Sequence, residues 1–334
     1  MDARALSGPG MPAFGEPAVV ALGGGHGLHA NLSALRLMSH HLTAVVTVAD
    51  DGGSSGRLRS EMDVLPPGDL RMALSALCDD SEWGHTWRDV LQHRFSSSGP
   101  LDGHAVGNLL IVTLWELLGD PVAGLDWVGR LLGARGRVLP MAAVPLGIEA
   151  DIEHDGAVAT VRGQSAVAVA PGRLRRVRLV PTDPPACGEA VEAVREADWV
   201  ILGPGSWFTS VMPHLLVPDL SAALHETRAR RCVTLNVGAF PRDEGAMTAL
   251  EHLRALREHA PDLRIDVVLA DPTAVDDVEA MADEATAMGA HLMLRQVRVG
   301  DGRAVHDPLR LAAAYRDAFE GVLGDVPRGP GLAG

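Results

Sequence analysis

The chain has 334 residues and a net charge of −14, from 29 basic and 43 acidic residues with no strongly basic block. That balance excludes broad electrostatic binding of nucleic acid, and a hydrophobic content of 47% excludes a chain that is disordered throughout. Lysine is absent, which excludes lysine Schiff bases and P-loop lysines. Three scattered cysteines without CxxC, and no apolar run of about 18 residues, predict a reduced cytoplasmic protein without membrane insertion.

Apolar, β-branched runs alternate with helical patterns, which predicts an α/β fold with a mainly parallel sheet. We expect a disordered leader over residues 1–16, a single domain over 17–323 and a disordered tail over 324–334. The first half predicts strands at 18–22 and 42–49 and helices at 70–78, 86–95, 106–118 and after Asp120. A β-rich excursion over about 138–180 follows, with a hairpin turn at Asp155-Gly156. The rhythm then resumes with helices at 185–197, 219–229 and 247–259 and strands at 199–202, 232–237 and 265–270.

The first glycine-rich loop, Gly23–Gly27, joins a predicted strand to a predicted helix. Glycines there let a phosphate approach the backbone, and the helix N-terminus supplies free N–H groups. We therefore predict phosphate binding, with a tight turn that holds no ligand as the alternative. The predicted contacts are Gly24, Gly25, His26 and Gly27.

A relaxed dinucleotide pattern is also present in Gly25, Gly27 and Ala30, with Asp50 twenty residues further on. It leaves an NAD-dependent dehydrogenase open as a further alternative. No hydride-transfer pair is evident, since the only tyrosine is Tyr315 and lysine is absent.

Two adjacent carboxylates end the second predicted strand and lead into a run of small residues. Carboxylates at a strand end hold hard cations or ribose hydroxyls, and successive small residues form anion-binding concavities. We expect a ligand-binding loop over 49–59, with an ordinary solvated turn as the alternative. Its predicted contacts are Asp50, Asp51, Gly52, Gly53 and Ser54.

Three later segments add candidates at helix starts and strand ends. Asp69 is predicted to cap a helix, with metal ligation as the alternative, and Arg71 in the first turn opposes the helix dipole unless an anion binds there. Asn108 opens an apolar helix, where its amide bonds either a sugar or base or the local backbone. Trp207 and Phe208 suit base stacking or core packing equally. Beside them, oxyanion or sugar contacts are predicted at Gly203, Gly205, Ser206, Thr209 and Ser210.

The chain resembles the YvcK-like family in its actinobacterial form over about residues 18–325. Five motifs carry the resemblance, in this order: VVALGGGHGL, TAVVTVADDGGSSGRLR, PPGDLRMAL, GHAVGNLL and GPGSWFTSVMPHLLV. Members are called gluconeogenesis factors or UDP-N-acetylglucosamine-binding proteins, and they group with CofD-like proteins, whose enzymatic branch is 2-phospho-L-lactate transferase. The resemblance implies a Rossmann-like three-layer αβα fold that binds a nucleotide sugar. It also implies a regulatory role in central carbon metabolism under gluconeogenic growth, cell-wall precursor supply and cell shape.

The resemblance implies UDP-N-acetylglucosamine as the ligand and favours a non-enzyme, because no catalytic activity is firmly attached to this branch. In the transferase branch, aspartates matching Asp50 or Asp51 and Asp69 hold a divalent metal. The alternative is therefore a metal-dependent phospholactyl-type transferase, with Mg²⁺ on Asp51 and Asp69. A regulator also implies a protein partner, and self-association stays open. The segment 238–247 reads GAFPRDEGAM where relatives carry a P-G-E-T-like turn, and His26 replaces a Thr or Ser.

Overall fold

The structure is a computed structural model that describes residues 16–238 and 247–323. The leader predicted over 1–16 falls, apart from Glu16, outside the described residues, and so does the tail predicted over 324–334. The divergent segment 238–247 is described only at its two ends.

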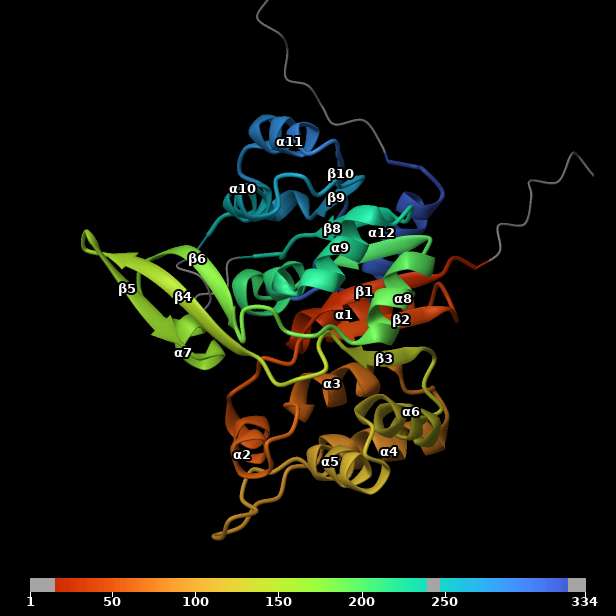
Figure 1. The fold of residues 1–334 in the computed structure, drawn as a ribbon. Helices are drawn as coiled ribbons and strands as arrows, with labels where there is room; N and C mark the ends of the chain where they lie inside the picture. Colours follow the sequence, from red (N-terminus) through yellow and green to blue (C-terminus); the bar gives the residue numbers. More distant parts are fainter. Residues whose placement is uncertain (1–15, 239–246, 324–334) are drawn as a thin grey trace, which may run out of the picture.

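A seven-stranded parallel sheet runs through the molecule (Figure 1), in the order β10-β9-β8-β7-β1-β2-β3. Its strands are β1 (Val19–Gly23), β2 (Leu42–Val46), β3 (Arg137–Pro140), β7 (Trp199–Leu202), β8 (Arg230–Thr234), β9 (Val267–Ala270) and β10 (His291–Leu294). The order reverses between β1 and β7, because the chain first builds β2 and β3 on one side of β1 and then builds β7 to β10 on the other. Such sheets bind ligands beyond the carboxyl ends of the strands at this reversal.

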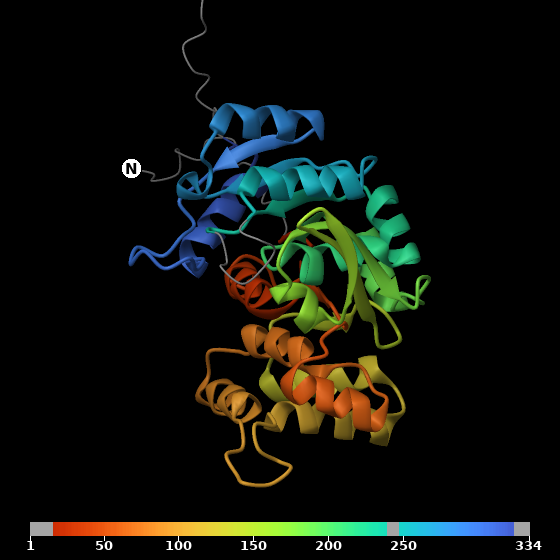
Figure 2. The same ribbon diagram turned by 90° about the vertical axis from the view of Figure 1, so that its left-hand side faces the viewer.

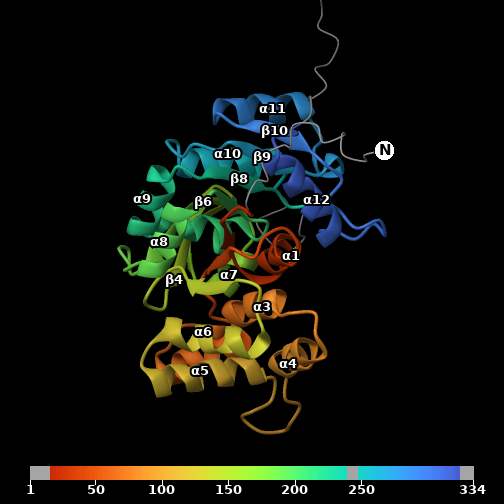
Figure 3. The same ribbon diagram turned by 90° about the vertical axis from the view of Figure 1, so that its right-hand side faces the viewer.

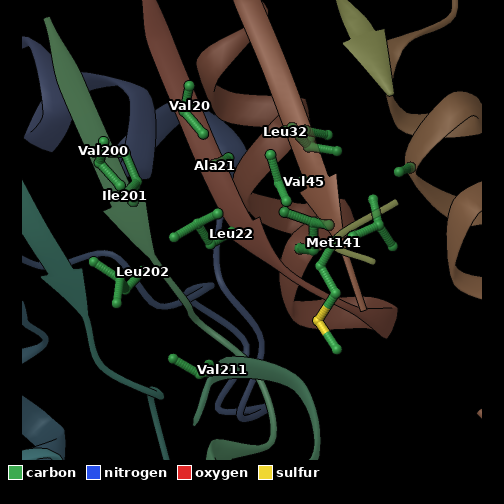
Figure 4. Close-up of a cluster of buried hydrophobic side chains, with 14 of the residues drawn as sticks. Val20, Ala21, Leu22, Leu32, Val45, Met141, Val200, Ile201, Leu202 and Val211 are labelled. Atoms are coloured by element: carbon green, nitrogen blue, oxygen red, sulfur yellow. The ribbon is translucent and has the colours of Figure 1, made fainter. Parts of the chain in front are cut away.

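Helices cover both faces of the sheet, which confirms the three-layer α/β prediction (Figure 3). On one face α1 (Gly25–Leu35) packs against α3 (Pro67–Leu77) and α12 (Pro308–Phe319). On the other, α8 (Gly188–Glu196) packs against α9 (Pro218–Glu226). Every residue of β1 and β7 is buried, as expected for parallel strands covered on both sides. Figure 4 shows the resulting core, in which Leu22, Val45 and Ile201 come from neighbouring strands. At the β10 end of the sheet, α10 (Ala249–His259) packs against α11 (Val278–Ala287).

A helical insert connects β2 to β3 and forms the lower part of Figure 1. It comprises α2 (Gly53–Met62), α3, α4 (Glu82–Gln92), α5 (Val106–Leu118) and α6 (Pro121–Leu132). The predicted bounds of α5 and the Asp120 cap of α6 are confirmed. The prediction of a loop over 49–59 is wrong from Gly53 onward. The small residues there serve close packing rather than flexibility, since a Cβ on Gly56 would lie 2.1 Å from the Asp51 carbonyl oxygen.

The β-rich excursion is a separate antiparallel sheet in the order β5-β4-β6 (Figures 1 and 2). It consists of β4 (Gly147–His154), β5 (Ala157–Arg162) and β6 (Arg173–Val180), and α7 (Gln164–Val169) connects β5 to β6. The predicted hairpin turn is confirmed, with φ of 51° at Asp155 and 78° at Gly156. The excursion begins at Gly147 rather than Val138, because Val138 lies on β3 and pairs with β2 in the main sheet.

Cys78, Cys187 and Cys232 are free thiols, and all three are buried. Cys187 precedes α8, Cys78 follows α3, and Cys232 lies on β8 in the interior of the main sheet. Within the two described ranges, no helix combines the length and apolar character needed to cross a membrane.

Candidate ligand-binding site

A cavity of about 870 Å³ lies where the loops after β1 and β7 meet. Its other walls come from the chain after β2 and β8, from α7 and from the segment before α12. This volume lies within the range of small-molecule sites. The predicted residues that line it are Gly24, Gly25, His26, Gly27, Asp50, Asp69, Gly205, Ser206, Thr209 and Ser210. The structure therefore brings the first and last predicted loops together, while Gly203 lies just outside.

The first loop is shaped by close contacts at its glycines. A Cβ on Gly24 would lie 2.4 Å from Thr47 Cγ2, and a Cβ on Gly27 would lie 2.3 Å from the Pro204 carbonyl oxygen. Gly25 adopts φ of +56°, which turns the chain from β1 into the first turn of α1. The N-terminus of α1 consequently opens on the cavity with no side-chain cap from Gly24, an arrangement suited to an anion.

Gly27→Ala is expected to force the first loop away from Pro204 and to abolish ligand binding. Overpacking against backbone is expected to lower the free energy of unfolding by about 1–3 kcal/mol. Thermal unfolding and calorimetry measure the two effects. Gly188→Ala is the control, because its Cβ meets no atom within 4 Å. Unchanged stability and ligand affinity in Gly27→Ala would contradict this account of the loop.

The loop after β7 is held in place by two asparagines that the sequence analysis missed. The Asn236 side chain accepts from the Gly205 N–H at 3.0 Å and donates to the Gly205 carbonyl at 2.9 Å. Asn31 of α1 donates to the Gly203 carbonyl at 2.7 Å. These bonds position the π-helical turn that follows, η1 (Trp207–Val211), so that Thr209 and Ser210 line the cavity. Trp207 and Phe208 are buried in the core, so core packing is the correct one of their two predicted roles.

Two carboxyl groups, Asp50 and Asp69, lie beside the first loop inside the cavity. Burial and the nearby Asp50 raise the pKa of Asp69 to about 7, against a hydrogen bond from the Gly25 N–H. Burial also raises the pKa of Asp50, opposed by the Gly52 N–H that it accepts at 2.9 Å. The prediction that Asp69 caps a helix is wrong, because α3 begins at Pro67 and Asp69 lies within its first turn.

Asp51 does not share a site with Asp69, contrary to the expected metal pair. Its carboxylate accepts from the Ser165 N–H at 2.9 Å and from the Ser165 hydroxyl at 2.7 Å, which connects α7 to the segment between β2 and α2. Asp50 is the carboxylate that lies near Asp69. In the described part of the chain, no group of three or more His, Cys, Asp or Glu side chains is suited to hold a metal. A pair of carboxylates nevertheless fits Mg²⁺, which usually completes its shell with water and substrate phosphates.

The remaining predicted contacts form a buried network behind the site. Arg71 Nε donates to Asn108 Oδ1 at 2.9 Å, and Asn108 Nδ2 donates to Ser54 Oγ at 3.0 Å. The Ser54 hydroxyl lies 3.0 Å from His104 Nδ1, and Arg71 also donates to Gln92. The cavity is not lined by Arg71, Asn108 or Ser54. Where an anion was expected at Arg71 and a sugar or base at Asn108, the structure shows hydrogen bonds to other side chains of the protein. Gly52 is the N-cap of α2 and Gly53 is its first residue, and neither lines the cavity.

Several cavity residues carried no signal in the sequence. Gln164 and Ser165 come from α7, and a segment from Val299 to Pro308 contributes an opposite wall. His29 and His306 also line the cavity, and burial lowers the pKa of both, that of His306 to about 4. Apart from His29, which lies between Gly27 and Ala30, these residues belong to no motif singled out in the sequence, and only the tertiary fold brings them to the cavity.

The model of the CofD family, described as 2-phospho-L-lactate transferase CofD, matches residues 19–299. A protein of Mycobacterium tuberculosis (strain H37Rv) is 53% identical over 302 residues, which is 88% of each chain. The gluconeogenesis factor of Bacillus subtilis (strain 168) is 34% identical over 91% of this chain and 99% of its own. A crystal structure of a UPF0052 family member from Bacillus halodurans superposes with a TM-score of 0.80 at 33% identity, over 90% of this chain and 99% of the other. The family match spans the sheet and most of the cavity, and the chain therefore belongs to the CofD family, in a group with curated gluconeogenesis factors.

Proposed function

We propose that this chain binds UDP-N-acetylglucosamine and acts as a regulator rather than as an enzyme. The observation that carries the proposal is the cavity at the strand-order reversal, where the N-terminus of α1 opens between the loops after β1 and β7 and its Gly25 N–H meets the Asp69 carboxyl group. A diphosphate suits this place, because the α1 dipole and N–H groups favour negative charge. Ser206 and Thr209 line the cavity from the facing loop, where the Thr209 hydroxyl donates to Ser206 Oγ at 2.5 Å.

Calorimetry with UDP-N-acetylglucosamine, UDP-glucose, GDP, NAD and ATP tests the ligand. We expect binding of UDP-sugars in the micromolar range and no heat with NAD or ATP. Gly27→Ala is expected to remove that binding, and Gly188→Ala is expected to retain it. Sub-millimolar binding of NAD or GDP without binding of UDP-sugars would reject the proposal.

The regulatory role is supported by the similarity to gluconeogenesis factors. We propose that the ligand-bound chain acts through a protein partner on central carbon metabolism, cell-wall precursor supply and cell shape. A strain lacking the chain is then expected to grow poorly on gluconeogenic carbon sources, and Gly188→Ala but not Gly27→Ala is expected to restore growth. Equal restoration of growth by both variants would show that the regulatory role does not depend on ligand binding in the cavity.

Asp50 and Asp69 favour a second candidate, a metal-dependent transferase of a phospholactyl-type group from a nucleotide donor. Mg²⁺ between these carboxylates and the donor phosphates would offset charge that develops on the transferred group. Incubation with Mg²⁺, nucleotide donors and small hydroxy-acid acceptors tests this candidate. Turnover that disappears in Asp69→Ala while nucleotide still binds would establish the transferase and reject the regulator.

A further inference from the structure

The apolar lining of the cavity is concentrated around one segment. Val299, Ala304, Val305 and Pro308 come from the chain just before and at the start of α12, and Ala30 comes from the second turn of α1. α1 and α12 pack against each other, which places this segment beside the outer part of α1 (Figure 3). The cavity follows α1 from Gly25 to Ser33, roughly 12 Å at the helical rise per residue. One end of the cavity is therefore a slot in which these apolar side chains lie beside the polar side chains of His29, Ser33 and His306.

This slot is preformed by its own hydrogen bonds. Residues 297–307 make a hairpin in which the Val299 N–H donates to the Val305 carbonyl at 3.0 Å and the Asp307 N–H donates to the Val297 carbonyl at 2.8 Å. The buried Asp271 carboxylate accepts from the N–H groups of Val297 and Arg298, each at 2.8 Å. A wall fixed in this way needs no ordering when a flat ring enters, which favours binding.

The opposite end of the cavity is polar and acidic. Asp69 lies there next to Gly24, Asp50 lies beside Gly52 and Gly68, and Gln164 lines the cavity from α7, which packs on η1. Carboxylates accept hydrogen bonds from hydroxyls, and a side-chain amide both donates and accepts. These carboxyl groups offer no apolar surface to the faces of a heterocycle. This end therefore suits a ring that carries hydroxyl and amide groups.

We infer that the cavity binds its ligand in one direction, with the nucleobase in the slot between α1 and the 297–307 hairpin and the sugar toward Asp50, Asp69 and Gln164. The inference rests on the proposed function. It assigns Val305 and Gln164 as residues that determine specificity for the base and for the sugar. Sequence reasoning points the other way, because a carboxylate twenty residues beyond a glycine-rich loop is typical of a ribose contact at the base end.

Photo-cross-linking with the 4-thiouracil analogue of UDP-N-acetylglucosamine tests the direction. Because the chain has no lysine, trypsin cuts only after arginine and isolates residues 299–307 of the hairpin in peptides 299–303 and 304–310, and α7 in peptide 163–173. We expect label in the hairpin peptides, competed away by unlabelled UDP-N-acetylglucosamine. Competed label confined to peptide 163–173, at the end assigned to the sugar, would overturn the inference.

Two substitutions give a second readout by calorimetry or NMR titration. Val305→Ser is expected to weaken UMP about tenfold and to leave N-acetylglucosamine 1-phosphate unchanged, while Gln164→Ala is expected to do the reverse. Val158→Ser on β5 is the matched control, since Val158 is also exposed and lies away from the cavity. The reversed pattern would overturn the direction. Binding of no UDP-sugar by the unmodified chain would instead reject the proposed function itself.

Discussion

Asp69→Asn is expected to raise the free energy of unfolding at pH 8 by about 2–4 kcal/mol. Burial and Asp50 raise the pKa of Asp69 from 3.8 to about 7, so between these values the folded chain keeps a proton that the unfolded chain has released. The stability that the protonated Asp69 contributes to the folded state is fully present below about pH 4, and it is lost as the pH rises through about 7. Asparagine resembles the protonated acid at every pH, which removes the loss. The lower figure allows for solvent that reaches Asp69 through the cavity.

Chemical denaturation at pH 4.5 and pH 8 measures this effect. The unmodified chain is expected to lose stability over this interval relative to Asp69→Asn, because titrating groups away from Asp69 act equally on both. Asp283→Asn, at an exposed position on α11, is the control that changes the net charge by the same amount. Parallel stability curves for the unmodified chain and Asp69→Asn would show that Asp69 is ionised at no cost in the folded state.

Arg71→Leu is expected to cost about 2–4 kcal/mol of unfolding free energy, from two amide oxygens that lose their donor. Arg71 is 3% exposed, and its guanidinium donates to Asn108 and Gln92. Leucine would leave the buried Asn108 oxygen and the half-buried Gln92 oxygen without these donors, and the α3–α5 contact would open around the lost side chain. The affinity of the molecules that stay folded for UDP-sugars is expected to be unchanged, because Arg71 does not line the cavity.

Urea denaturation and calorimetry below the midpoint separate these two effects. Arg316→Leu on the exposed side of α12 removes the same charge and is expected to change stability by less than about 0.5 kcal/mol. A large loss of ligand affinity in folded Arg71→Leu would restore the interpretation in which this arginine faces a bound anion.

The fold could be predicted from the sequence wherever one local signal decides an element. The apolar run Trp199–Leu202 and the Asp120-Pro121 helix start each need only neighbouring residues, and both are confirmed. The segment from Gly53 to Met62 could not, because glycine and serine suit a loop as well as a tightly packed helix. Its helical state depends on contacts such as Gly56 against Asp51, which the local sequence does not display.

In the candidate site, too, residues with a local signal could be predicted, and residues whose role depends on distant contacts could not. Gly24 and Gly27 could be predicted because a residue without Cβ at a strand end signals close approach of another group. Arg71 was misread because its position against the helix dipole is offset by two amide side chains that lie 21 and 37 residues away. The hairpin around Val305 gave no signal, since an apolar residue in a turn acquires a role only once α12 packs beside α1.

Because all three cysteines are buried, the rate at which a thiol reagent labels each of them reports how often that part of the unmodified chain unfolds locally. Thiol reagents attack the thiolate, and burial raises the pKa of Cys187 to about 11 and that of Cys232 to about 12. Cys78 and Cys187 flank helix ends, whereas Cys232 lies between β7 and β9. Labelling of the first two is therefore expected to follow fraying at the helix ends, and labelling of Cys232 is expected to follow disruption of the whole sheet. The labelling rates of the three thiols therefore compare the local stability of these three regions without any engineered label.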